Sequence, residues 1–193
     1  MHSTNPTRVL VSEGSSLSSR EAVTALGAAG CHVEVCDPDP RCLARFSRFV
    51  QRVHPCPHFG SDPAAYEAFV RERLAGGAFD VLYPAHEQVY LFARRRRALA
   101  RLAGLPVPSF EAIEAVQGKV ATAATFERLG IPTPACAVVR SEAEVRAAFA
   151  RLGGSCFLKA DIGTASRSIW RIDRAPDLTA PLELLAEGGA LRD

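Results

Sequence analysis

The chain carries only two lysines, Lys119 and Lys159, against 21 arginines among its 23 basic residues. This skew suggests high-GC coding, under which a cation without a special task becomes arginine. The two remaining lysines are therefore the first candidates for chemistry that needs a compact ammonium group instead of a planar guanidinium. Neutralising the charge of a phosphate is chemistry of that kind.

The ten residues that begin at Lys159 are the most informative stretch. The lysine ends an apolar run and is followed by a loop that contains Gly163, Thr164, Ala165 and Ser166. Small side chains let backbone N–H groups approach a ligand closely, and a polyphosphate is bound by amide and hydroxyl donors beside an ammonium group. The alternative interpretation is a mobile hairpin turn that carries a surface lysine.

Lys119 stands where a helix is expected to begin, directly after Gly118. Helix N-termini favour anions, so this lysine could be directed at one. Taken alone it would be an ordinary surface lysine. The two lysines lie forty residues apart, and each is followed by characteristic glycines or prolines, which favours a shared anion site.

These stretches together resemble a known family. Lys119 with Leu129-Gly-Ile-Pro-Thr-Pro134, followed by Phe157-Leu-Lys159 with its loop and by Ser168-Ile-Trp-Arg-Ile172, resembles the first nucleotide-binding lobe of ATP-grasp ligases. The nearest likeness is to the carboxylate-amine ligase and carbamoyl-phosphate-synthase-like branch. The resemblance covers nearly the whole chain, in order and spacing more than in residue identity.

The resemblance implies a nucleotide site and a reaction. Lys119 and Lys159 match the two lysines that contact the phosphates of ATP, and Gly163, Thr164, Ala165 and Ser166 match the loop that covers them. In the family, ATP with Mg2+ phosphorylates a small carboxylate, and an amine or similar nucleophile attacks the acyl phosphate. The expected partners are therefore ATP and small carboxylate and amine substrates.

Two positions depart from the family pattern. Ala160 stands where the family commonly has proline, and Ser168 where it commonly has glycine. The family's adenine and magnesium residues lie farther along, so we expect the Mg2+ ligands outside this chain. We expect the 193 residues to be a fragment or truncated relative that catalyses nothing alone.

Two other functions remain open. A degenerate, non-catalytic relative could act as a binding or interaction module that offers its exposed lobe to a partner or forms a homo-oligomer. A nucleotide-sugar or dinucleotide enzyme could be built on the first α/β unit alone. The absence of G-x-G-x-x-G argues against the dinucleotide enzyme.

The elements that would position these residues follow from hydrophobic patterning. Residues 8–12 and 32–36 predict two strands joined by a helix over 20–30 that Ser18 or Ser19 caps, a βαβ unit with parallel strands. A helix over 63–74, a strand over 80–84 and a helix over 87–102 continue the pattern. Residues 1–105 thus predict a small open parallel sheet, which the resemblance identifies as the Rossmann-like pre-ATP-grasp domain.

A different pattern follows the prolines at 106 and 108. Residues 109–129 predict two short helices around Gly118, and 135–140 predict a strand. A helix over 141–152 and a hairpin of strands 156–160 and 168–172 come next. Residues 106–193 thus predict an α+β unit, which the resemblance identifies as an incomplete first ATP-grasp lobe.

Other polar clusters have two interpretations each. His54, Cys56 and His58 could ligate zinc or form an irregular surface segment. Arg94–Arg97 is expected to be a solvated helix because consecutive helical residues splay around the axis. The segment 14–19 either contacts substrate or only caps a helix, and Glu87 either contacts substrate or complements a helix dipole.

Composition excludes several classes. The net charge of +2 does not indicate nucleic acid or an anionic membrane surface, and no apolar run approaches the roughly 18 residues of a membrane span. The N-terminus lacks the apolar stretch of a signal peptide. Six cysteines without a C-x-x-C pair indicate reduced thiols. We therefore expect a cytoplasmic protein.

Overall fold

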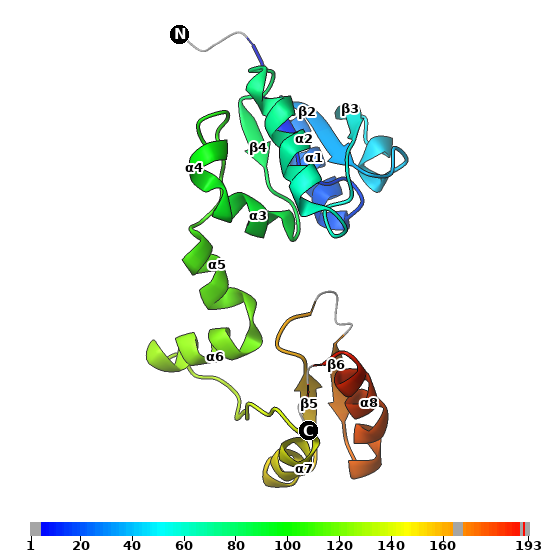
Figure 1. Cartoon of the computed structure of the whole chain (residues 1–193), viewed down its shortest axis with the longest axis vertical. Helices are drawn as coiled ribbons and strands as arrows, with labels where there is room; N and C mark the ends of the chain where they lie inside the picture. Colours follow the sequence, from blue (N-terminus) through cyan, green and yellow to red (C-terminus); the bar gives the residue numbers. More distant parts are fainter. Residues whose placement is uncertain (1–4, 164–167, 190, 192–193) are drawn as a thin grey trace. The chain divides into compact units, whose positions relative to one another are not determined.

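The computed structural model describes residues 5–163, 168–189 and 191. The chain divides into two compact units, Met1–Phe110 and Glu111–Asp193 (Figure 1). Each unit buries apolar side chains of its own. The first unit holds a four-stranded sheet and the second a two-stranded sheet. The predicted class, a parallel α/β sheet followed by an α+β lobe, is confirmed.

The sheet of the first unit is parallel throughout. Its strands are β1 (Arg8–Val11), β2 (His32–Asp37), β3 (Val50–Pro55) and β4 (Val81–Tyr83), in the order β3-β2-β1-β4. The chain moves outward from β1 to β3 and then returns to the other side of β1. The loops that follow β1 and β4 therefore flank the point at which the strand order reverses, where open α/β sheets commonly bind ligands.

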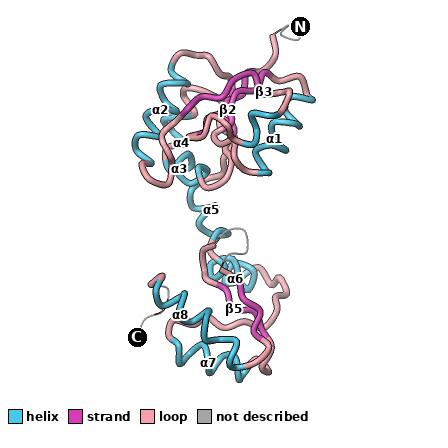
Figure 2. Tube along the Cα trace, turned by 90° about the vertical axis from the view of Figure 1, so that its right-hand side faces the viewer, coloured by secondary structure: helices cyan, strands magenta, loops and turns pink. Residues whose placement is uncertain are grey.

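Helices cover both faces of this sheet. Figure 2 shows α1 (Leu17–Ala28) and α2 (Pro63–Ala75) on opposite sides of it. Because side chains alternate along a strand, β1 sends Val9 and Val11 into the core under α1 and Leu10 into the core under α2. Asp62 caps α2 by accepting a hydrogen bond from the N–H of Ala65 at 2.9 Å.

The second unit is built around a hairpin of β5 (Cys156–Lys159) and β6 (Ile169–Ile172), which are antiparallel. Its core residues lie on α7 (Glu142–Arg151), on the hairpin, on a short 3-10 helix and on α8 (Thr179–Glu187). They are Val145, Leu158, Ile172, Leu178, Leu182 and Leu185. The two short helices expected around Gly118 are α5 (Phe110–Gln117) and α6 (Lys119–Arg128).

One strand was missed, and three expectations about elements were wrong. Strand β3 was not expected, because its exposed Gln51 and Arg52 suit an edge strand and hide its apolar pattern. The helix over 87–102 is interrupted at Arg95 and forms α3 (Gln88–Arg94) and α4 (Arg96–Leu99). Helix α1 is capped by Ser16, not by Ser18 or Ser19.

The third wrong expectation was a strand over 135–140. These residues form neither helix nor strand and pair with no strand among the described residues. A strand needs a ladder of hydrogen bonds to a neighbour, which apolar patterning alone does not supply.

Across the described ranges, we find no helix with the length and apolar character that crossing a membrane requires.

Candidate functional site

Lys119 is the first residue of α6 and is half-buried. Its Nζ donates a hydrogen bond to the main-chain oxygen of Asp161 at 3.1 Å, and its backbone N–H donates to the same oxygen at 3.1 Å. The neighbouring N–H of Val120 donates to Oδ1 of Asp161 at 2.9 Å. The N-terminus of α6 is thus held by a residue of the hairpin.

Lys159 ends β5 and is exposed, and it pairs with Ile169 across the hairpin. Its Nζ lies 5.8 Å from the centre of the Phe157 ring, a weak cation–π contact. Asp161, which binds Lys119, follows only two residues later. The structure therefore brings Lys119 to the end of the strand that carries Lys159.

The loop after Lys159 is described only in part. Gly163 lies against Ser168, so a Cβ at position 163 would come within 3.0 Å of both Cβ and Oγ of Ser168. The N–H of Ala160 donates to the main-chain oxygen of Ser168 at 3.0 Å and extends the pairing of the hairpin. The other predicted loop residues, Thr164, Ala165 and Ser166, lie outside the described residues.

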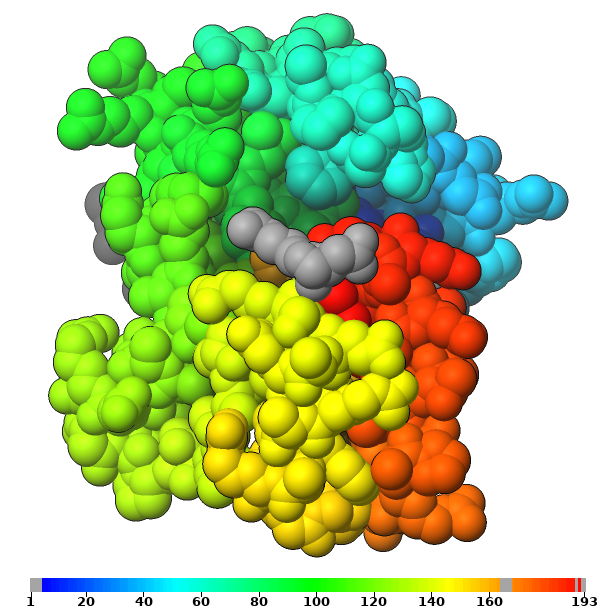
Figure 3. Space-filling model, turned by 60° about the horizontal axis from the view of Figure 1, so that its bottom comes forward, coloured from blue at the N-terminus to red at the C-terminus, as the bar shows by residue number. Residues whose placement is uncertain are grey.

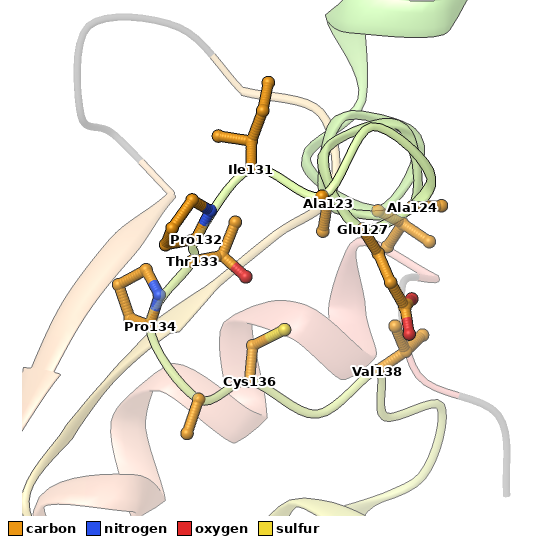
Figure 4. Close-up of a pocket in the computed structure, with 12 residues that line it drawn as sticks. Ala123, Ala124, Glu127, Ile131, Pro132, Thr133, Pro134, Cys136 and Val138 are labelled. Carbon is orange, nitrogen blue, oxygen red and sulfur yellow. The ribbon is translucent and has the colours of Figure 1, made fainter.

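A groove of about 620 Å³ runs between α6 and the extended segment that follows it. Figure 4 shows Ala123, Ala124 and Glu127 on the helix side, facing a chain that turns from Ile131 to Val138. No side chain of α6 is fully buried, and its yellow-green surface is open to view in Figure 3. The groove is therefore an open surface lined by small, apolar and proline side chains, with one carboxylate.

At the carboxyl end of the parallel sheet, Asp37 is 2% exposed and closes the loop after β1. Its Oδ2 accepts hydrogen bonds from the N–H of Gly14 and from the hydroxyl of Ser15, each at 2.9 Å, and its Oδ1 accepts from the N–H of Asp39 at 2.8 Å. Both oxygens of this carboxylate are thus bonded within the fold. That arrangement disfavours the dinucleotide enzyme, in which such an acid binds a ribose.

Glu13 fills the N-terminus of α1 with the chain's own carboxylate. It accepts hydrogen bonds from the backbone N–H groups of Ser15 and Ser16 and from the hydroxyls of Ser16 and Ser19 at 2.7 and 2.8 Å. Helix N-termini attract anions, and here the attraction is satisfied internally. For the segment 14–19 this favours the helix-capping interpretation over substrate contact.

The loop after β4 contains His86, whose φ of 54° is rare for a residue other than glycine. Its Nδ1 lies 2.8 Å from the carboxylate of Glu87. Burial is the largest single influence and raises the pKa of Glu87, but the hydrogen bond with His86, a backbone hydrogen bond and the electrostatic attraction of His86 together outweigh it, so the pKa of the carboxyl is lowered. The pair lies at the end of β4, beside the reversal of strand order.

His54 does not belong to a zinc site. Its Nε2 lies 2.5 Å from the carboxylate of Glu34, which is also 2.8 Å from Nε2 of His32. Within the described ranges, no three His, Cys, Asp or Glu side chains gather as metal ligands would. The segment that holds His54 is the end of β3, so the expectation of an irregular segment was also wrong for this residue.

The four consecutive arginines make different contacts, although the helix expected to carry them is interrupted at Arg95. Arg94 lies over the ring of Phe110 at 4.4 Å, and Arg95 pairs with Glu67 at 3.0 Å. All four arginines are exposed. These four arginines therefore do not form a single basic face suited to nucleic acid.

Comparison with known proteins gave matches only among solved structures. A scan of protein-family models and a search of curated proteins found no match. N5-carboxyaminoimidazole ribonucleotide synthetase in complex with ADP superimposes on 96% of this chain with a TM-score of 0.70 and 17% identity. L-amino acid ligase from Bacillus licheniformis superimposes on 95% with a TM-score of 0.66 and 18% identity.

A third match is the biotin carboxylase domain of 2-oxoglutarate carboxylase from Hydrogenobacter thermophilus, with a TM-score of 0.68, 17% identity and 96% of this chain covered. All three solved structures are ATP-grasp enzymes. The chain has the fold of part of an ATP-grasp enzyme. It spans less than half of these solved chains, from 42% to 45% of their length.

The ATP-grasp resemblance inferred from sequence is therefore confirmed at the level of the fold. Sequence reasoning missed Asp161, which joins the hairpin to α6. Its position two residues after Lys159 was visible, but no local pattern indicates that it caps a helix forty residues earlier.

Proposed function

We propose that this chain binds the phosphates of ATP as part of an ATP-grasp ligase. The observation that carries the proposal is the hydrogen bond from Lys119 to Asp161, which lies two residues beyond the end of the strand that carries Lys159. The ammonium group of Lys119, which is bonded to Asp161, and that of Lys159, at the end of β5, would together neutralise a polyphosphate and hold it for transfer. Residues 1–105 would be the pre-ATP-grasp domain and 106–193 the first lobe.

The reaction we propose for the complete enzyme follows from the family. ATP would convert a small carboxylate to an acyl phosphate, and an amine or similar nucleophile would displace the phosphate. In this chain Lys119 and Lys159 would orient the transferred group and balance its charge. The small side chains of Gly163, Thr164, Ala165 and Ser166 in the sequence would let the backbone amide groups of this loop approach the same phosphates.

Magnesium does not fit the described residues. One matched structure holds MgADP, but no group of three or more His, Cys, Asp or Glu side chains in the described part of this chain is arranged to hold a metal ion. Asp161, the acid beside Lys119, already accepts a hydrogen bond from the N–H of Val120. We therefore assign no step through magnesium to these residues.

The test is binding of a fluorescent ATP analogue to the 193-residue chain. We expect Lys119→Ala and Lys159→Ala each to weaken binding by about tenfold, since each removes one charge contact with phosphate. Arg128→Ala, at the other end of α6, is the matched control and should leave the affinity unchanged. The proposal is wrong if the unsubstituted 193-residue chain binds no nucleotide, or if both lysine variants bind the analogue as tightly as the unsubstituted chain.

The groove along α6 favours a second candidate, a non-catalytic interaction module. Val120, Ile131 and Val138 line it and remain 39%, 42% and 52% exposed. Exposed apolar side chains of this kind mark contact surfaces. Light scattering decides this: a stable oligomer that Ile131→Asp dissociates, together with absence of nucleotide binding, would favour the module over the ligase.

A further inference from the structure

Helix α6 is capped from outside its own sequence. Helices α1, α2 and α7 each begin with a side-chain cap from Ser16, Asp62 and Ser141. At the same position α6 has Gly118, which has no side chain to offer. Asp161 supplies the missing acceptors with its carboxylate and its main-chain oxygen.

Gly118 makes this cap sterically feasible. A Cβ on Gly118 would lie 2.9 Å from Oδ1 of Asp161 and 3.2 Å from Oδ2. The backbone of Gly118, with φ of −76° and ψ of 141°, is open to any residue. The glycine is therefore required by the approach of the carboxylate and not by backbone strain.

The cap determines where Lys119 lies. Both the N–H and the Nζ of Lys119 donate to the main-chain oxygen of Asp161. Because Asp161 follows Lys159 by two residues, the position of one lysine is tied to the strand that carries the other. A binding site works best when such groups are held in place before the ligand arrives.

We propose that Asp161 is a positioning residue of the phosphate site, which locks the N-terminus of α6 and the ammonium group of Lys119 onto the β5 end of the hairpin. This inference rests on the proposed nucleotide site. It assigns to Asp161 no contact with the phosphates. Its action passes through Lys119 and the backbone of α6.

The experiment measures the affinity for the fluorescent ATP analogue, and separately the hydrogen exchange of the Val120 amide without ligand. Asp161→Ala removes the cap, and Gly118→Ala displaces it from the other side without changing Asp161. Asp161→Asn retains an oxygen that can accept the same N–H bond. Gly76→Ala, where a Cβ would meet nothing within 4 Å, and Asp177→Ala, which removes a different cap in the same unit, are the controls.

We expect Asp161→Ala and Gly118→Ala to weaken analogue binding by about tenfold and to speed exchange at Val120, because Lys119 is then no longer held. Asp161→Asn should bind within about threefold of the natural chain, because its cap remains. The controls should bind normally. Equal affinity of Asp161→Ala, Gly118→Ala and the natural chain would overturn the inference alone, whereas absence of binding by the natural chain would overturn the proposed function as well.

Discussion

The carboxylate of Glu34 on β2 lies 2.5 Å from Nε2 of His54 on the neighbouring strand β3. The side chains of Glu34 and His54 are 18% and 8% exposed. Burial is the largest single influence and raises the pKa of Glu34, but the hydrogen bonds and electrostatic attraction of His32 and His54 together outweigh it, so the pKa of the carboxyl lies below its ordinary value of 4.5. The pair ties the edge strand β3 to the sheet.

This pair predicts a dependence of stability on pH. Since the pKa of Glu34 is lowered by folding, its contribution is complete above pH 4.5 and is lost as the pH falls through the lowered value. Glu34→Gln should lower the free energy of unfolding by about 1 kcal/mol near neutral pH and have a smaller effect at about pH 3. Urea unfolding at both pH values measures this. The exposed Glu72→Gln is the control, and an equal loss at both pH values would contradict the prediction.

Two tyrosines predict opposite results. The hydroxyl of Tyr66 is buried and donates to the main-chain oxygen of Ser12 at 2.6 Å. Tyr66→Phe should cost about 1 to 2 kcal/mol of unfolding free energy, because the oxygen of Ser12 loses this donor. The hydroxyl of Tyr90 is buried without a hydrogen-bond partner in the described part of the chain, so Tyr90→Phe should be neutral or stabilising. Thermal unfolding of both variants compares them, and equal losses would refute the assignment.

The contact between Gly163 and Ser168 predicts a double-mutant effect. Gly163→Ala should destabilise the second unit by about 1 kcal/mol, because its Cβ would press on the side chain of Ser168. In a Ser168→Gly background that cost should disappear, which gives a coupling energy of about 1 kcal/mol. Chemical unfolding of the four chains measures the coupling. Additive effects would show that the two residues do not press on each other.

The cap of α1 can be located by two serine variants. Ser16 accepts a hydrogen bond from the N–H of Ser19 at 3.1 Å, so Ser16→Ala should cost about 1 kcal/mol of unfolding free energy. Ser18→Ala should cost less than about 0.5 kcal/mol, since Ser18 lies inside the helix and is exposed. If Ser18→Ala proved the more costly in urea unfolding, the helix would begin later than the structure shows.

The amino-acid sequence by itself determined the elements with strong local patterning. The first βαβ unit follows from alternating apolar residues and a helix between them, and helix α2 begins where Asp62-Pro63 predicts it. The hairpin and the two lysines at the ends of their elements were also predictable, because strand, turn and helix-start preferences are local. The confirmed ATP-grasp fold rests on the order of these elements.

Tertiary structure alone decided the contacts between distant residues. Asp161 caps a helix whose first residue lies 42 positions earlier, and Glu34 meets His54 across 20 positions. The fold also left 135–140 without a strand partner among the described residues and placed β3 at the edge of the sheet. Such outcomes depend on which backbone donors lack a local partner and on which acceptor the fold places beside them. That is decided by proximity in three dimensions, which the periodicity of residues along the chain does not reveal.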